Sequence, residues 1–324
     1  MNITVEAWDK SDKANRAILS LVCDAFPLAF VPKPDESLQF LTDLTTGFEE
    51  SFFVAKENHQ LVGFALLSRG RDSETASMSG CVSRLYRRLG TGKRLLQELM
   101  QTIRTHPSIR RLTTSTYASD QSGQDFLENA GFSEVDRVFW SQCPVDHEFP
   151  AWCLAKEQHI GIRELKFLTG GEYKRTVDEW ARKLWQLDTK SACDIPSTVG
   201  FEPTAFEEWL KFTESEFVNF DQALVAVCDH LPVGVLKLGA VENDKMNINY
   251  TGVARSHRRI GLSTVLKMKA FEHARRHGAQ WVTTQNHQNN PIYSLNLSMG
   301  FRTIETIIEF SKSLDVHSSA TQRS

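Results

Sequence analysis

Residues 82–93 read VSRLYRRLGTGK, and residues 253–264 read VARSHRRIGLST. The two stretches align without a gap, and Gly90 and Gly261 lie 171 positions apart. A second pair of landmarks, the glycines followed by phenylalanine at Gly131 and Gly300, lies 169 positions apart. Two landmarks in the same order and at nearly the same offset indicate an internal repeat. The chain is therefore predicted to contain two halves of one architecture.

The repeated stretch combines features that suit a phosphate-bearing ligand. In each half a strand is predicted to run into the arginines and the glycine, and a helix to begin directly afterwards. Glycine permits the tight turn, and the start of a helix leaves backbone N–H groups without partners. Those donors and the helix dipole favour phosphate or pyrophosphate, and arginines add positive charge. One such loop is typical of an ordinary exposed turn, whereas its repetition favours a binding site.

Length and composition limit the class of protein. The chain has 324 residues, which suits two domains of about 150 residues each. It is 41% hydrophobic and 24% charged, as globular proteins are. A formal charge of −3 gives no basic field for nucleic acid. The sequence shows neither a secretion signal nor an apolar run of ~18 residues, so no membrane partner is expected.

The cysteines indicate the compartment. They are widely scattered, and the spacing of the His, Cys and Asp residues does not suggest a metal site, so no metal is predicted. We interpret the cysteines as reduced thiols of a cytoplasmic protein. The six are Cys23, Cys81, Cys143, Cys153, Cys193 and Cys228.

Hydrophobic patterning and turn residues predict the remaining elements. In the first half, strands are expected at 3–7, 51–56, 61–68, 78–83 and 111–116, and helices at 12–25, 37–44, after Gly90 and at 123–129. In the second half, strands are expected at 161–165, 223–228, 233–241, 247–253, 281–285 and 303–310, and helices at 172–187, 205–213, 262–277 and 292–299. The predicted domains are 1–145 and 159–313, with a linker at 146–158 and a polar tail at 314–324.

This ordered set resembles the GNAT superfamily of N-acetyltransferases, and in particular its tandem two-domain members. The acetyl-CoA signature of that family is Gln/Arg-x-x-Gly-x-Gly/Ala. Arg87, Gly90 and Gly92 match it fully, whereas the second half has Arg258 and Gly261 but Ser263 in place of the final Gly or Ala. The family's usual proline after the strand is replaced by an arginine in both halves.

The resemblance implies an α/β (α+β) fold. Each of the two tandem domains would be a mixed, mostly antiparallel twisted sheet flanked by helices. Two strands of each sheet would splay apart in a V, those ending at Val82 and Thr116 and those ending at Val253 and Gln285. The arm of acetyl-CoA would lie in that notch.

The activity implied is direct transfer of an acetyl group from acetyl-CoA to a primary amine of a small molecule, in the C-terminal domain. Backbone N–H groups near Val253 would polarise the thioester carbonyl. The residues expected to bind acetyl-CoA are Val82, Arg84, Arg87, Arg88, Leu89, Gly90, Thr91, Gly92 and Lys93, together with Val253, Ala254, Arg255, Arg258, Arg259, Ile260, Gly261, Leu262, Ser263, Thr264, Asn286, Asn290 and Asn296.

The leaving thiolate needs a proton, which this family often takes from a tyrosine on the last short helix. That position holds Leu127 in the first half and Asn296 in the second, and neither is an acid. Tyr293, on the same helical face as Asn296, is the candidate catalytic residue; a tyrosine packed at a helix start is the other interpretation. His287 is expected at the surface, and most of the aromatic residues between 180 and 220 are expected in the core.

Two alternatives stay open. Catalysis in the N-terminal domain is the first, because its glycine motif is the more complete. A non-catalytic acyl-CoA-binding or regulatory module is the second, because neither half has the tyrosine at its usual position. The acceptor amine stays open, and the chain is expected to be a monomer or a homodimer.

Overall fold

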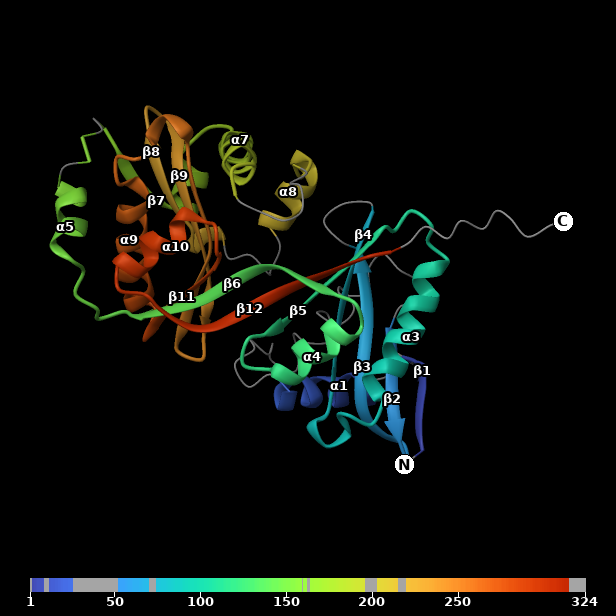
Figure 1. Cartoon of the computed structure of the whole chain (residues 1–324). Helices are drawn as coiled ribbons and strands as arrows, with labels where there is room; N and C mark the ends of the chain where they lie inside the picture. The colour runs from blue at the N-terminus through green and yellow to red at the C-terminus, as the bar shows by residue number, and fades with distance from the viewer. Residues whose placement is uncertain are drawn as a thin grey trace. The chain divides into compact units, whose positions relative to one another are not determined.

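The computed structural model describes residues 2–8, 12–25, 52–69, 74–158, 160–161, 164–195, 203–214 and 220–314 (Figure 1). The helix expected at 37–44 and the tail beyond residue 314 lie outside these ranges. Among the described helices, none combines the length and apolar character that crossing a membrane requires. The chain divides into two compact units, the first made of Met1–Thr116, Ser122–Val135 and Glu309–Ser324, and the second of Tyr117–Gln121 and Asp136–Ile308.

The first unit is a sheet with helices on both faces. Successive strands from β1 to β4 pair antiparallel, and β4 pairs with β5 in parallel. On β3, Phe64 packs with Ile18 of α1, while the neighbouring Gly63 leaves room for Leu95 of α3 on the opposite face. The elements are β1 (Ile3–Ala7), α1 (Asp12–Ala25), β2 (Phe52–Glu57), β3 (Gln60–Arg69), β4 (Thr75–Val82), the 3-10 turn η1 (Arg84–Tyr86), α3 (Thr91–Arg104), β5 (Arg111–Tyr117) and α4 (Gln121–Asn129).

The second unit repeats the plan with more helices. Its strands follow the order β6–β11–β10–β9–β8–β7, in which only β10 and β11 are parallel. The elements are β6 (Ser133–Pro144), α5 (Ala151–Gln158), β7 (Lys166–Thr169), α6 (Gly170–Thr176), α7 (Trp180–Ala192), α8 (Phe206–Thr213), η2 (Phe220–Gln222), β8 (Leu224–Cys228), β9 (Leu231–Glu242), β10 (Lys245–Val253), η3 (Arg255–His257), α9 (Leu262–Arg276), β11 (Trp281–His287), α10 (Pro291–Ser298) and β12 (Arg302–Ser313).

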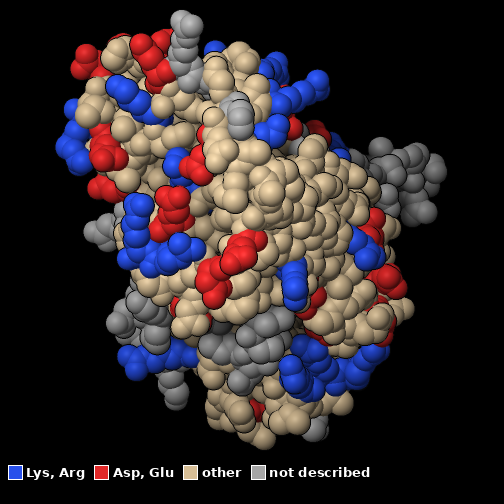
Figure 2. Space-filling view, turned by 90° about the vertical axis from the view of Figure 1, so that its left-hand side faces the viewer, with Lys and Arg blue, Asp and Glu red and all other residues tan. Residues whose placement is uncertain are grey.

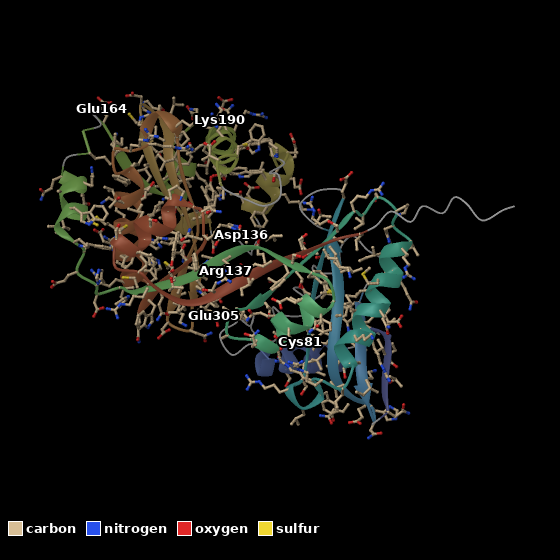
Figure 3. All side chains as sticks on the ribbon, in the orientation of Figure 1. Cys81, Asp136, Arg137, Glu164, Lys190 and Glu305 are labelled. Carbon is tan, nitrogen blue, oxygen red and sulfur yellow. The ribbon has the colours of Figure 1, made fainter. Side chains whose placement is uncertain are left out.

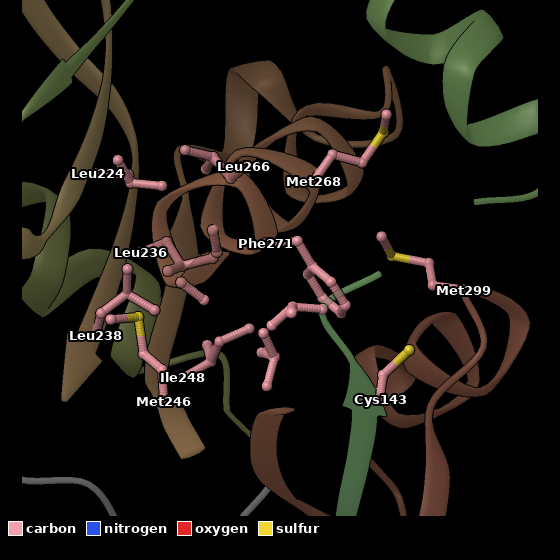
Figure 4. Packing of buried hydrophobic residues seen from close by; sticks show 14 of the residues in the cluster. Cys143, Leu224, Leu236, Leu238, Met246, Ile248, Leu266, Met268, Phe271 and Met299 are labelled. Carbon is pink, nitrogen blue, oxygen red and sulfur yellow. The ribbon is translucent and has the colours of Figure 1, made fainter. Parts of the chain in front are cut away.

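Alternation along β8 separates two cores in the second unit. Leu224 and Ala226 face the cluster that contains α9, part of which Figure 4 shows, whereas Val225 and Val227 face α6, α7 and α8. Because side chains alternate along a strand, helices cover both faces of this sheet. Compact units do not define where one copy of a repeat ends, so the domain limits 1–145 and 159–313 stay a prediction.

Most predicted elements are confirmed, and one prediction for the second half is wrong. The strand expected at 161–165 is instead β7, which ends where a capping box of Thr169 and Glu172 starts α6. The helical region expected at 172–187 consists of two helices, α6 and α7. It breaks because Val177 is extended and enters the core, and Glu179 is left-handed with φ 54°.

The sequence analysis did not predict β6 or α5. Val138 and Cys143 are buried on β6, but the buried residues Asp136 and Ser141 are polar, which hides the alternation of a strand. Helix α5 lies in the stretch 146–158 that was interpreted as a linker. Its Cys153 is fully buried in the core that contains α9.

Candidate functional site

The two repeated loops follow the same backbone path. Each begins with a single 3-10 turn, η1 or η3, and continues with an extended arginine, whose φ is −72° at Arg87 and −83° at Arg258. Two left-handed residues then lead into the helix. Their φ angles are 63° at Arg88 and 82° at Gly90 in the first unit, and 65° at Arg259 and 97° at Gly261 in the second. The predicted repeat is therefore present in the geometry as well as in the sequence. We call residues 83–90 the N-terminal loop and residues 254–261 the C-terminal loop.

The first arginine of each pair fixes its loop to the preceding strand. Nε of Arg87 donates to the carbonyl oxygen of Val82 at 3.1 Å, and Nε of Arg258 donates to that of Val253 at 3.0 Å. In the first unit the same guanidinium also donates to Oγ of Ser122 at 2.8 Å. Both arginines therefore shape the loop, a role that the sequence analysis did not assign to them.

Both helices that follow the loops start without a side-chain cap. Gly90 and Gly261 occupy the capping positions and have no side chain to accept from the first turn. By contrast, the side chains of Thr169 and Asn290 cap α6 and α10. The first N–H groups of α3 and α9 therefore point out of the helix without a helical acceptor, as a phosphate site requires.

The strands beside each loop splay as predicted. Strand β4 pairs with β5 only over Thr75–Ser77, and β10 pairs with β11 only over Lys245–Ile248. The later residues of β4 and β10, up to Val82 and Val253, are not paired with β5 or β11. Their backbone groups on that side can hydrogen-bond a ligand arm.

A groove of about 780 Å³ lies beside the N-terminal loop, between α3 and α4. The loop that leads to it is open: Leu89 is 47% exposed, and a Cβ atom built on Gly90 would have no atom within 4 Å. The residues that line this N-terminal groove are Lys93, Leu96, Gln97, Met100, Gln101, Arg104, Phe126, Asn129 and Ala130.

The corresponding surface of the second unit is covered by its own chain. We call residues 145–158, which include α5, the strap. A Cβ atom built on Gly261 would lie 2.7 Å from Cδ of Lys156, and one built on Gly300 would collide with the ring of His147. Ile260 packs against the core, whereas its counterpart Leu89 is exposed. The C-terminal loop is therefore less accessible than the N-terminal loop.

An aspartate also binds the arginines of the C-terminal loop. Asp194 accepts from Nε and Nη2 of Arg255 at 3.0 and 2.5 Å and from Nη2 of Arg258 at 2.7 Å. Hydrogen bonds from Arg255 and then Arg258 lower the pKa of Asp194 to about 2. The positive charge that was expected to meet a phosphate is therefore partly neutralised within the second unit.

The polar residues predicted near the second splay form two groups. Asn286 and Asn296 are buried and joined, with Nδ2 of Asn296 donating to Oδ1 of Asn286 at 2.6 Å. Tyr293 instead stacks on Phe139 of β6, and its hydroxyl lies 3.0 Å from Oγ1 of Thr303. The structure therefore places Tyr293 over β6 and β12. These strands lie on the side of β11 away from β10, so Tyr293 is not at the splay between β10 and β11. Its role as an acid stays a prediction.

Several other residues have defined surroundings. Leu127 is buried, as expected for a residue that serves packing rather than proton transfer. His287 is not an isolated surface residue, because its Nδ1 lies 2.7 Å from Oδ2 of Asp136, which Figure 3 labels. Cys81, also labelled there, is buried on the splayed part of β4, and burial raises its pKa to about 12.

Sequence reasoning missed a partly buried ion pair in the second unit. Asp188 of α7 accepts from Nζ of Lys237 at 2.5 Å and from Nε1 of Trp209 at 2.8 Å. Trp209 and Phe220 are buried in the core, as expected for the aromatic residues of this region, whereas Phe212 is 62% exposed. In the sequence, only the position of Asp188 on the buried face of α7 indicates that this carboxylate needs a partner. That position does not identify the partner as a lysine on β9.

The charges on the face drawn in Figure 2 are mixed. Basic and acidic side chains are interspersed there, without one continuous basic surface among the described residues. This matches the small formal net charge of −3. Neither this face nor the net charge indicates a broad basic surface, so we interpret only the basic residues of the two loops in terms of function.

Comparison with known proteins supports the repeat. A sequence model of the acetyltransferase (GNAT) family matches residues 15–132 and again residues 179–301. A search of curated proteins finds none that matches. Among solved structures, a GCN5-related N-acetyltransferase from Sphaerobacter thermophilus is similar, with 20% identity, a TM-score of 0.70, and coverage of 96% of this chain and 95% of that chain.

A tandem GNAT protein from the clavulanic acid biosynthesis pathway is also similar, with 18% identity and a TM-score of 0.72. The alignment covers 96% of this chain and 98% of that one. At these identities the likenesses show the fold, while the two segments matched by the family model show the family. The chain belongs to the GNAT family of acetyl-CoA-dependent N-acetyltransferases and carries two copies of its fold in tandem.

Proposed function

We propose that this enzyme transfers an acetyl group directly from acetyl-CoA to a primary amine of a small molecule, and that acetyl-CoA binds to the first unit. The observation that carries the proposal is the combination, in that unit, of an open loop, an uncapped helix and an adjacent groove. The second unit has the same backbone at its loop, but the strap covers that loop. Asp194 pairs with two arginines there, whereas Asp125 pairs with one, Arg88, in the first unit.

The residues of the first unit fit the ligand. The N–H groups at the start of α3 and the ammonium of Lys93, which lines the groove, would hold the phosphates. Phe126, on the opposite wall, supplies an apolar surface, and its ring would lie 3.3 Å from a Cβ atom built on Gly92. The backbone groups of β4 beyond Ser77 on the side away from β3 would hydrogen-bond the arm and polarise the carbonyl. The bound thioester supplies the activated acetyl group.

Direct transfer fits the chemistry of the nearby thiol. A covalent relay through Cys81 would need a thiolate. With a pKa raised to about 12 by burial, this thiol is protonated at neutral pH. The amine would therefore attack without an acyl-cysteine intermediate, helped by being held beside the thioester.

Catalysis in the second unit is the other candidate, and one observation favours it. The buried pair Asn286 and Asn296 ends at the splay between β10 and β11, and Oδ1 of Asn296 lacks a partner among the described residues. Tyr293 is the proposed acid of this alternative. Its present contacts with Phe139 and Thr303 mean that it would have to turn toward the splay.

The remaining parts of the proposal concern the surroundings of the enzyme. We infer a cytoplasmic location, because the described cysteines are free thiols. The acceptor would be a small amine, and the chain a monomer or a homodimer. These inferences rest on the family and on composition rather than on the geometry of a site.

The proposal is tested by filling the groove. Gln101 lines the N-terminal groove. By the repeat offset of 171, the matching residue in the second unit is Glu272 on α9, whose side chain is exposed. We expect Gln101→Trp to weaken acetyl-CoA binding roughly 10- to 100-fold, the effect of overpacking by 1–3 kcal/mol. Glu272→Trp is the matched control and should leave binding unchanged. Calorimetry measures both.

Turnover is followed as release of free CoA over a panel of amines. Loss of both binding and release in Gln101→Trp alone supports the first unit. Loss in Glu272→Trp alone assigns the enzyme to the second unit. Binding without release on any amine would indicate a non-catalytic acyl-CoA-binding module.

A further inference from the structure

The strap follows the surface between α9 and α10 at several points along its length. Nη2 of Arg275 on α9 donates to the carbonyl oxygen of Val145 at 2.5 Å. Further along, Phe149 meets Phe271 edge to face with 4.9 Å between ring centroids. In the middle of α9, Nζ of Lys269 donates to Oε1 of Glu157 at 3.1 Å, and Lys156 lies against Gly261 at its start. The strap therefore runs beside α9 from its last turn toward its first.

These contacts coincide with the positions that form the groove in the first unit. With the repeat offset of 171, Met100 and Arg104 of the N-terminal groove correspond to Phe271 and Arg275. With the offset of 169, Ala130 corresponds to Met299, which is fully buried in the core with Cys153 of α5. The strap thus occupies in the second unit the space that is open in the first.

Burial along the two helices shows the same difference. Helix α3 buries a single stripe, whereas α9 is buried nearly all round. Lys267, at the position of Leu96 in the N-terminal groove, is completely buried, and its Nζ has no hydrogen-bond partner among the described residues. Its Nζ lies 6.0 Å from the centroid of the Phe301 ring. An ammonium buried without a hydrogen-bond partner is costly, so Lys267 is better suited to a groove that holds an anionic ligand than to an apolar core.

We propose that the strap is an intramolecular plug, which keeps acetyl-CoA out of a second binding groove in the C-terminal unit. Lys156 covers Gly261 at the predicted phosphate site, and Val145, Phe149 and Cys153 fill the groove behind it. The proposal rests on the function proposed above, because it takes acetyl-CoA as the ligand. The wild-type enzyme would then bind one acetyl-CoA per chain.

The strap is able to move because little of it is buried. Of α5, only Cys153 is buried, while Lys156 and most of its neighbours are exposed. The single described ion pair to α9 is partly exposed, which limits its contribution to about 1 kcal/mol or less. Local opening of such a segment requires less free energy than unfolding of the unit.

The experiment counts acetyl-CoA molecules per chain by calorimetry and native mass spectrometry. The opened enzyme is the double variant F149A/A155P, in which proline breaks α5 and the shortened side chain leaves Phe271. F149A/A155S is its matched control. If the double variant does not fold, Ala155→Pro alone replaces it, because position 155 is exposed. Hydrogen exchange at 151–158 reports whether α5 has opened.

We expect one acetyl-CoA on the wild type, two on the opened enzyme, and one on the opened enzyme that also carries Gln101→Trp. Two on the wild type would overturn the plug and leave the proposed function intact. An opened enzyme whose strap exchanges fast but which still binds one would also overturn it. A wild type that binds none, with an opened enzyme that binds one, would support the plug but overturn the N-terminal assignment; none on either would overturn both.

Discussion

The N-terminal and C-terminal loops share a backbone and differ in what covers them. Both turn through two left-handed residues into an uncapped helix. The first is open and leads to a groove of about 780 Å³, whereas the second lies under Lys156. Arginines are paired with an aspartate at both loops, Arg88 with Asp125 in the first and Arg255 and Arg258 with Asp194 in the second. If the proposed function is right, the difference shows that a repeated local geometry is not sufficient for a binding site. Segments distant in the sequence decide whether the ligand can reach it.

The largest effect expected from this comparison concerns Lys267, buried where the first unit has Leu96. Burial lowers the pKa of Lys267 to about 7, below its ordinary value of 10.5. At neutral pH, Lys267→Met should therefore stabilise the second unit by an amount on the order of a few kcal/mol. Chemical denaturation with a probe in that unit measures the change.

The lowered pKa of Lys267 also predicts how the stability of the second unit changes with pH. Between about pH 7 and pH 10.5 the unfolded chain binds a proton at Lys267 that the folded chain does not, so the stability of the wild type rises with pH across this window. Lys267→Met should remove that part of the rise. A variant that is less stable than the wild type at pH 7 would show that the ammonium has a partner.

The next effect concerns charge at the open loop. Lys93→Glu places a negative charge at the start of α3, beside the groove, and should weaken acetyl-CoA binding about tenfold by repelling the phosphates. Lys166→Glu, at an exposed position on β7, makes the same change in net charge and should have no effect. Equal losses of acetyl-CoA affinity in both variants would show that the effect comes from the net charge of the protein and not from the position of Lys93.

A smaller effect is expected at Asp194. Because its pKa is lowered, this carboxylate contributes stability above its ordinary pKa of 3.8, and the contribution is lost as the pH falls toward about 2. Asp194→Asn should lower the melting temperature of the second unit slightly at pH 7 and not at pH 2. An equal decrease at both values would show that the charge is not what holds Arg255 and Arg258.

The smallest effect is expected at Tyr293. If the first unit catalyses, Tyr293→Phe removes only a hydroxyl near Thr303 and should change kcat by less than about twofold, as most surface changes away from a site do. Steady-state kinetics and acetyl-CoA binding are measured together. A tenfold lower kcat with unchanged affinity would assign the chemistry to the second unit and make Tyr293 its acid.

The sequence predicts what depends on near neighbours. The left-handed glycines, the helices after them and most strands follow from local patterns, and the doubled motif identifies the loops. It also predicts charge at these loops, but not that Arg87 and Arg258 each donate to the strand behind them, because that is a matter of geometry.

The strap could not be predicted, because its contacts join distant parts of the chain. Phe149 meets Phe271, and Glu157 meets Lys269, each across more than a hundred residues. The stretch 146–158 has charged residues at both ends of the apolar run 149–155, and nothing in this pattern indicates which surface the apolar side chains cover. Its cover over α9 is visible only when the second unit is folded.

The central claim is that acetyl-CoA reaches the N-terminal loop and not the C-terminal one. Peptide-level hydrogen exchange with and without acetyl-CoA tests it directly, because bound phosphates protect the amides that they accept from. We predict slower exchange at residues 88–93, including Gly90 and Gly92, and no change at residues 259–264. Protection at 259–264 with no change at 88–93 would contradict the account.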